Sequence, residues 1–149
     1  MATLQLNLIK QWFDLTLQGI KKEEYRDISL LWANRLLCME NGDNLTKCYS
    51  KETIEWICIS LKRWEDLDYA SIEQVLDTFH IKFKEYQNTD FRNGYKSLDK
   101  VPRFIIENKG ITIGKGKEKW GFTGCIPKFI IQHGEVVEIF NIKQTTQNF

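Results

Sequence analysis

The chain has 149 residues, of which 42% are hydrophobic and 28% are charged, and its formal net charge is +1. This length suits one domain with its own core and is short for two. A net charge near zero argues against a protein that binds polyanions nonspecifically, because such proteins carry a broad basic surplus. It is compatible with a small basic pocket for one nucleotide or a short single strand.

The cysteines and histidines form no metal-binding pattern, because no Cys-x-x-Cys pair occurs and neither histidine lies in a group of possible ligands. The first fifteen residues lack the apolar core of a signal peptide, and no stretch approaches the about 18 apolar residues of a membrane-spanning helix. We therefore expect reduced thiols in a cytoplasmic protein, with no metal, no cofactor and no membrane partner. The residues concerned are Cys38, Cys48, Cys58, Cys125, His80 and His133.

The first half of the chain predicts two strands that alternate with helices, followed by a helical segment. Apolar residues recur at every second position where a strand is expected and at helical spacing elsewhere. Ser50 is expected to cap one helix, and Ser71 with Gln74 has the pattern of a capping box. The predicted ranges are 4–9 and 21–27 for strands, and 10–19, 28–39, 50–64 and 71–79 for helices.

After about residue 83 the pattern changes to strands and turns. Asn93-Gly94 is the strongest short turn signal in the chain and is typical of a two-residue hairpin. The predicted strand ranges are 102–116, interrupted by Gly110, and 127–143, divided into two strands at His133-Gly134. The whole order predicts a single α+β domain, in which the strands of the second half curl into a small barrel.

Gly19, Lys21, Glu24 and Arg26 form a G-x-K-x-x-E-x-R pattern directly after the first predicted helix. The glycine can take the positive φ that a helix C-terminus needs. Arg26 offers a planar fork for a carboxylate or phosphate, and Glu24 on the same strand face can hold that fork. Lys21 beside a second cation has the setting of a nucleophilic or general-base lysine. On the local sequence alone, a solvated edge strand is favoured by about two to one.

Two further segments carry side chains suited to nucleic acids. Arg92 and Asn93 can donate hydrogen bonds to phosphate oxygens or base edges, and Tyr95 offers a stacking surface. A plain hairpin turn would explain Asn93-Gly94 as well. Trp120 follows a loop rich in glycine and lysine that lacks the spacing of a phosphate-binding loop. We interpret Trp120 first as an anchor at a barrel end and second as a stacking residue.

Taken together, these segments resemble the ASCH domain, a small β-barrel relative of the PUA domain, in its bacterial and phage subgroup. The resemblance covers about residues 4–40 and 83–140 and implies one domain over 1–149. It implies a small PUA-like β-barrel with N-terminal helices and a helical insertion at about 46–82. The residues that carry it are Gly19, Lys21, Glu24, Arg26, the FRNGY segment at 91–95, and the segment FIIENKGITIGKG…KWG at 104–121.

The resemblance implies an RNA- or nucleotide-binding domain with a charged cleft at the barrel mouth. Its ligand-binding residues would be Lys21, Glu24, Arg26, Trp32, Arg92, Asn93, Tyr95 and Trp120. Some family members remove the acetyl group from acetylated cytidine with a lysine nucleophile, a hydroxyl residue and a glutamate, and a few are linked to RNA cleavage. The alternative is therefore a small amidohydrolase or RNA-processing enzyme with Lys21 as nucleophile or base. Glu24 occupies the hydroxyl position, which argues for binding over cleavage.

A third hypothesis is a protein-binding adaptor or phage-type inhibitor that acts through residues 46–82. These hypotheses leave open whether the protein is an enzyme, and the sequence predicts no oligomeric state. They differ in what each requires: a ligand held by Arg26 and Arg92, a reaction that depends on Lys21, or a partner lost with the helical segment.

Overall fold

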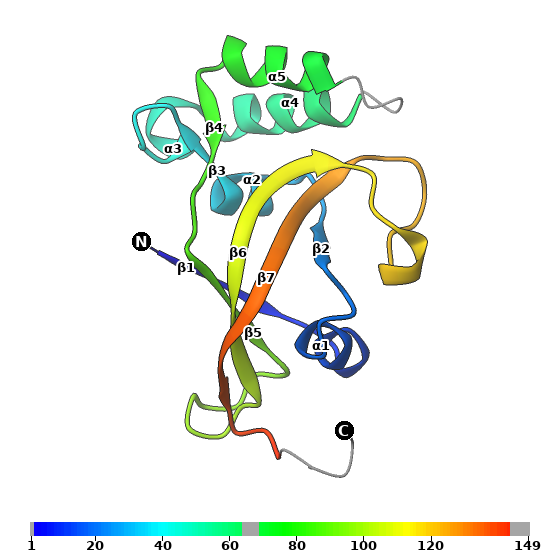
Figure 1. Cartoon of the computed structure of the whole chain (residues 1–149). Helices are drawn as coiled ribbons and strands as arrows, with labels where there is room; N and C mark the ends of the chain where they lie inside the picture. The colour runs from blue at the N-terminus through cyan, green and yellow to red at the C-terminus, as the bar shows by residue number, and fades with distance from the viewer. Residues whose placement is uncertain (1, 64–68, 144–149) are drawn as a thin grey trace. The chain divides into compact units, whose positions relative to one another are not determined.

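The computed structural model describes residues 2–63 and 69–143 of the chain (Figure 1). Over these residues the protein is a mixed α+β structure with five α-helices, one short 3-10 helix and seven strands. The described chain divides into two compact units. Unit 1 comprises 2–22, 86–109 and 132–143, and unit 2 comprises 23–63, 69–85 and 110–131.

Unit 1 is built around two neighbouring strands that are far apart in sequence. Strand β1 (Thr3–Asn7) pairs in parallel with β5 (Asn88–Arg92), and β5 pairs antiparallel with the first half of β6 (Arg103–Gly114). Helix α1 (Lys10–Leu17) follows β1 and buries Phe13, whose ring meets that of Phe104 edge to face at 4.9 Å. Alternate residues of β1 are buried, as the period-two pattern predicts.

Helix α1 ends where the sequence predicts. The N–H of Gly19 donates to the carbonyl oxygen of Thr16 at 3.1 Å, and Gly19 has a φ of +77°. The N–H groups of Ile20 and Lys21 then both donate to the carbonyl oxygen of Leu15. A residue with a Cβ would be strained at this φ, so the glycine lets the last helical carbonyls be satisfied while the chain turns.

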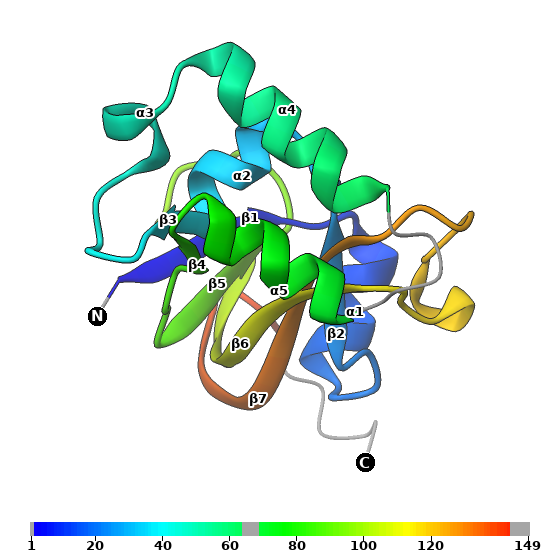
Figure 2. The ribbon, with the colours of Figure 1, turned by 90° about the horizontal axis from the view of Figure 1, so that it is seen from above.

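Unit 2 contains one short strand, four α-helices, the 3-10 helix Glu118–Trp120, a two-stranded sheet and parts of two long strands. Helix α4 buries one apolar stripe, and Ser50 caps it by accepting the N–H of Thr53 at 3.2 Å, as predicted. Helices α4 and α5 pack side by side (Figure 2). The elements are β2 (Glu23–Arg26), α2 (Leu30–Leu36), β3 (Leu37–Met39), α3 (Leu45–Cys48), α4 (Lys51–Lys62), α5 (Tyr69–Thr78) and β4 (Ile81–Phe83), with β3 antiparallel to β4.

Two long strands have residues in both units. The strand order of the larger sheet is β1-β5-β6-β7-β2, and β7 (Lys128–Phe140) and β6 each continue from one unit into the other. Gly110 has a φ of +119° and does not interrupt β6. The prediction of two strands around His133-Gly134 is wrong, because β7 passes through both residues without a turn.

Three other local predictions are also corrected. Asn93-Gly94 does not close a two-residue hairpin, since residues 93–102 lie between β5 and β6. Ser71 does not cap a helix, because α5 already includes Tyr69. The helix predicted over 28–39 ends at Leu36. Residues 37–39 contain no β-branched residue and still form the strand β3, because they pair with β4. The local sequence does not reveal that partner.

The segment 46–82 is helical over most of its described length, as predicted, but it ends in β4. Residues 64–68 of this segment lie outside the described part of the chain, as does the tail from 144 onward. The description of this segment as an insertion, and of the sheet as a PUA-like barrel, stays a prediction. Across the described ranges, no helix combines the length and the apolar character that crossing a membrane requires.

Candidate nucleotide-binding residues

The motif residues Glu24 and Arg26 lie on the same face of β2. The Nη2 of Arg26 is 3.1 Å from the Oε2 of Glu24, and the two side chains are only 21% and 9% exposed. The guanidinium carbon of Arg26 also lies 4.9 Å from the ring centre of Trp32, and that of Arg35 lies 4.7 Å from the same ring. We call these four residues the Trp32 cluster. The Trp32 ring thus makes favourable cation–π contacts with two guanidinium groups.

On the opposite face of β2, Tyr25 is held by two hydrogen bonds of its hydroxyl group. The hydroxyl of Tyr25 donates to the Oε1 of Glu23 and accepts the N–H of Lys117, both at 3.0 Å. Burial is the main cause that raises the pKa of Tyr25 to about 12, so the phenol is neutral at physiological pH. A Cβ at Gly116 would overlap the Cζ of Tyr25, so only glycine fits against this ring as it is placed.

In unit 1, Asp90 joins two arginines from adjacent strands. Its Oδ2 is 3.1 Å from the Nη2 of Arg92 and 3.0 Å from the Nη1 of Arg103. Arg92 and Arg103 are register partners across β5 and β6, which is why one carboxylate can reach both. We call these three residues the Asp90 cluster. The side chains of Arg92 and Arg103 are 21% and 16% exposed, and the cluster carries one net positive charge, two guanidinium groups against one carboxylate.

The segment after Arg92 divides between structural and exposed residues. The Nδ2 of Asn93 donates to the carbonyl oxygen of Leu8 at 2.9 Å, so this amide holds two chain segments of unit 1 together. Tyr95 is 91% exposed, which leaves both faces of its ring accessible for stacking. Of the FRNGY segment, Arg92 and Tyr95 therefore have side chains that a ligand can reach.

Lys21 is almost completely buried, with 1% of its surface exposed. Its Nζ lies 5.4 Å from the ring centre of Trp12 in α1. The next residue, Lys22, is exposed, and its carbonyl oxygen accepts the N–H of His133 at 3.1 Å. Lys21 is thus held in the interior of unit 1, close to a histidine that the sequence did not connect with it.

His133 is a neutral imidazole at physiological pH. Its pKa is lowered from 6.5 to about 3, mainly by burial and in smaller part by the charges of Lys21 and Lys22. Its ring meets the ring of Phe91 edge to face at 5.1 Å. Within the described residues, neither ring nitrogen has a hydrogen-bond partner.

Trp120 is an internal residue of unit 2. It ends the 3-10 helix Glu118–Trp120, is 7% exposed, and has the ammonium groups of Lys117 and Lys119 at 4.6 and 4.8 Å from its ring centre. This placement fits an anchor residue. Stacking of a base on this ring would require those contacts to be displaced.

Three residues of the two clusters belong to no motif that the sequence predicts: Asp90, Arg103 and Arg35. A signal for Asp90 was present, because it precedes Arg92 by two residues just as Glu24 precedes Arg26. In a strand that spacing puts both side chains on one face. Arg103 had no comparable signal, since its place opposite Arg92 depends on the pairing of β5 with β6.

No known family model and no curated protein matches the sequence, and no solved structure matches the structure. The resemblance to the ASCH domain therefore rests on the motif residues and their order. The geometry of the two arginine clusters stands independently of it.

Proposed function

We propose that the protein is an RNA- or nucleotide-binding module of the ASCH type, with a PUA-like barrel, and that arginine side chains hold the phosphates of its ligand. The observation that supports this most is the Asp90 cluster, in which two guanidinium groups share one carboxylate and both remain partly exposed. A planar guanidinium can bind a phosphate through two hydrogen bonds. Tyr95, with its exposed ring in the same unit, supplies a stacking face for a base.

The Trp32 cluster supports the same function in unit 2. Arg26 is oriented by Glu24 at 3.1 Å and by the Trp32 ring, so little side-chain entropy is lost when it binds an anion. Lys21, Asn93 and Trp120, which the resemblance also assigns to the ligand, are buried or engaged in contacts within their own units. We assign them a positioning role in this proposal.

The test is the binding of short single-stranded RNAs and nucleotides, measured by fluorescence anisotropy at several salt concentrations. Arg92→Gln is expected to weaken RNA binding about tenfold and to lower the slope of log K against log salt by about 0.7, the value for one phosphate contact on a single strand. Arg63→Gln is the matched control, because Arg63 is an exposed arginine at the end of α4 outside both clusters. Absence of binding, or an equal loss in both variants, would contradict the proposal.

A small amidohydrolase acting on modified nucleosides is the second candidate, with Lys21 as its nucleophile, and the placement of this lysine in the interior of unit 1, out of contact with solvent, favours it. Lys21→Met is then expected to stop the consumption of acetylcytidine, whereas Lys22→Met, at an exposed neighbour, is expected to leave it nearly unchanged. No turnover at high enzyme concentration would remove this candidate.

A further inference from the structure

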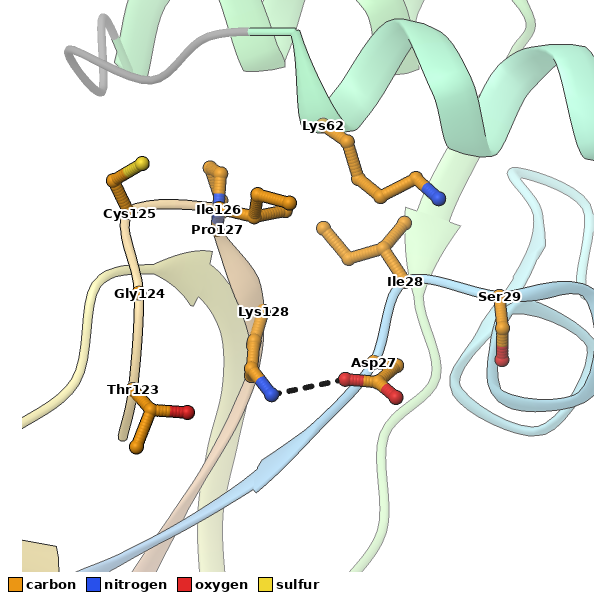
Figure 3. Close-up of a pocket in the computed structure, with 10 residues that line it drawn as sticks. All are labelled: Asp27, Ile28, Ser29, Lys62, Thr123, Gly124, Cys125, Ile126, Pro127 and Lys128. Carbon is orange, nitrogen blue, oxygen red and sulfur yellow. Dashed lines mark hydrogen bonds and ion pairs between the residues drawn. The ribbon is translucent and has the colours of Figure 1, made fainter. Parts of the chain in front are cut away.

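Unit 2 contains a cavity that none of the proposed ligand-binding residues lines. Its volume is about 520 Å³, within the range of about 300–1,000 Å³ that is typical of small-molecule sites. Three segments form it: the stretch 27–29 after β2, Lys62 at the end of α4, and the stretch 123–128 before and into β7 (Figure 3). All three segments belong to unit 2, so the cavity is a feature of this unit alone.

Most of the surface that lines the cavity is apolar, and three of its residues are aliphatic: Ile28, Ile126 and Pro127. Ile28 is 1% exposed and lies in the view of Figure 3 between the Lys62 side chain and the ion pair below it, while Pro127 is buried beside Ile126. Ile126 is 53% exposed, so its side chain has apolar surface that a ligand can cover. No aromatic residue is among the ten that line the cavity. The cavity therefore has no aromatic ring on which a nucleobase could stack.

The charged groups of the cavity leave one cation without a carboxylate. Lys128 and Asp27 form an ion pair with 3.0 Å between Nζ and Oδ1. Within the part of the chain that the structure describes, Lys62 makes no ion pair, although it lines the same cavity. The lining thus carries one net positive charge, which matches a single negative charge on a ligand.

We propose that this cavity binds a small aliphatic monocarboxylate, whose carboxylate pairs with Lys62 and whose hydrocarbon body packs on Ile28, Ile126 and Pro127. Burial of the hydrocarbon supplies most of the affinity, and the ammonium group selects the charge. A dianionic phosphate would bring one more negative charge than the lining balances. This site is additional to the phosphate-binding arginines and does not depend on them.

Two free, exposed cysteines, one inside the cavity lining and one outside it, allow the proposal to be tested on the intact protein. Cys125 lines the cavity and is exposed, whereas Cys48 is exposed on α3 and does not line it. Cys38 and Cys58 are buried. The rate at which iodoacetamide modifies Cys125, followed by mass spectrometry, therefore reports on the cavity, and the rate at Cys48 is the internal control.

Octanoate is the probe, with octanamide as its neutral isostere and adenosine monophosphate as the phosphate-bearing comparison. Octanoate is expected to slow the modification of Cys125 at least about fivefold in a saturable way and to leave Cys48 unchanged. Octanamide is expected to require about tenfold higher concentration for the same protection, since it lacks the charge that pairs with Lys62. Equal protection of Cys48, or no protection of Cys125 at millimolar octanoate, would overturn the proposal.

Substitutions on α4 complete the test. Lys62→Met is expected to raise the octanoate concentration for half-protection about tenfold, while Lys51→Met, an exposed lysine in the first turn of the same helix, leaves it unchanged. An unchanged value in Lys62→Met would overturn the assignment of the carboxylate to this lysine. Stronger protection by adenosine monophosphate than by octanoate would overturn the ligand class.

Discussion

Two strands of this protein carry the same pattern, an acidic residue two positions before an arginine, with different surroundings. Glu24 and Arg26 in β2 are 3.1 Å apart, and so are Asp90 and Arg92 in β5. In both pairs the arginine is 21% exposed and the carboxylate is below 10%. The pairs differ in the second partner: Asp90 binds another arginine, whereas Arg26 lies on a tryptophan that it shares with Arg35.

The difference shows two ways to hold two guanidinium groups near each other. In the Asp90 cluster one carboxylate compensates both charges, so its loss leaves two neighbouring cations without their counter-charge. In the Trp32 cluster the ring attracts both cations through its quadrupole, and Glu24 still pairs with Arg26 if the ring is removed. The first arrangement should therefore be more sensitive to a single substitution than the second.

The largest expected effect follows from removing the shared carboxylate. Asp90→Ala is expected to lower the free energy of unfolding by about 3 kcal/mol, because breaking a buried ion pair leaves uncompensated charge in the interior. Urea-induced unfolding followed by circular dichroism measures it. Asp99→Ala, in an exposed position of the loop 93–102, is the control and should cost about 0.5 kcal/mol or less. A small loss for Asp90→Ala would show that the arginines do not need it.

An effect of intermediate size is expected in unit 1, where His133 makes the free energy of unfolding depend on pH. The pKa of His133 is about 3 in the folded protein against an ordinary 6.5, so the unfolded chain takes up the proton first as the pH falls. The stability that this group contributes is complete above about pH 6.5 and decreases toward pH 3. Between pH 7 and pH 5 the loss should be about 2 kcal/mol.

His133→Phe is expected to remove this loss, because the variant has no group to protonate at that position. The measurement is the free energy of unfolding of both proteins at pH 8, 7, 6 and 5. At pH 8 the histidine is neutral in both states, so the comparison there isolates the change in packing against Phe91. The same acid-dependent loss in wild type and variant would show that other groups cause it.

The smallest effect concerns the shared ring. Trp32→Leu is expected to cost about 1 kcal/mol, since two partly exposed cation–π contacts are lost while the Glu24–Arg26 pair persists. Trp56→Leu is the control, because Trp56 is 62% exposed on α4 and should be nearly neutral. Thermal unfolding of both variants measures the difference. A loss for Trp32→Leu as large as that for Asp90→Ala would mean that the two clusters do not differ as described.

The sequence predicted those features that depend on residues close together in the chain. The turn at Gly19, the cap at Ser50 and the pairing of Glu24 with Arg26 across one residue all follow from local spacing, and the structure has them. Features that depend on pairing between distant segments were missed. Arg103 reaches Asp90 only through the register of two strands. The charge of Lys21 acts on His133 only because β7 passes beside Lys22, whose carbonyl oxygen accepts the N–H of His133.

Local signals were also misleading where tertiary contacts decided the outcome. Asn93-Gly94 is typical of a tight hairpin, yet the Asn93 side chain is used to hold Leu8, and the chain takes a longer path before β6. His133-Gly134 looks like a turn and lies inside a strand, where a Cβ on Gly134 would lie within 3.0 Å of the Glu107 and Lys109 side chains, which would have to move. A glycine can thus mark close packing as well as a turn.

The passage of β6 and β7 through both units has a consequence for synthesis on the ribosome. Every described residue of unit 2 precedes position 132, whereas unit 1 also needs the second half of β7, from Gln132 onward. Because chains emerge from their N-terminus, unit 2 can form while unit 1 still lacks a strand. The earliest residues, β1 and α1, must therefore wait for some of the latest before unit 1 is complete.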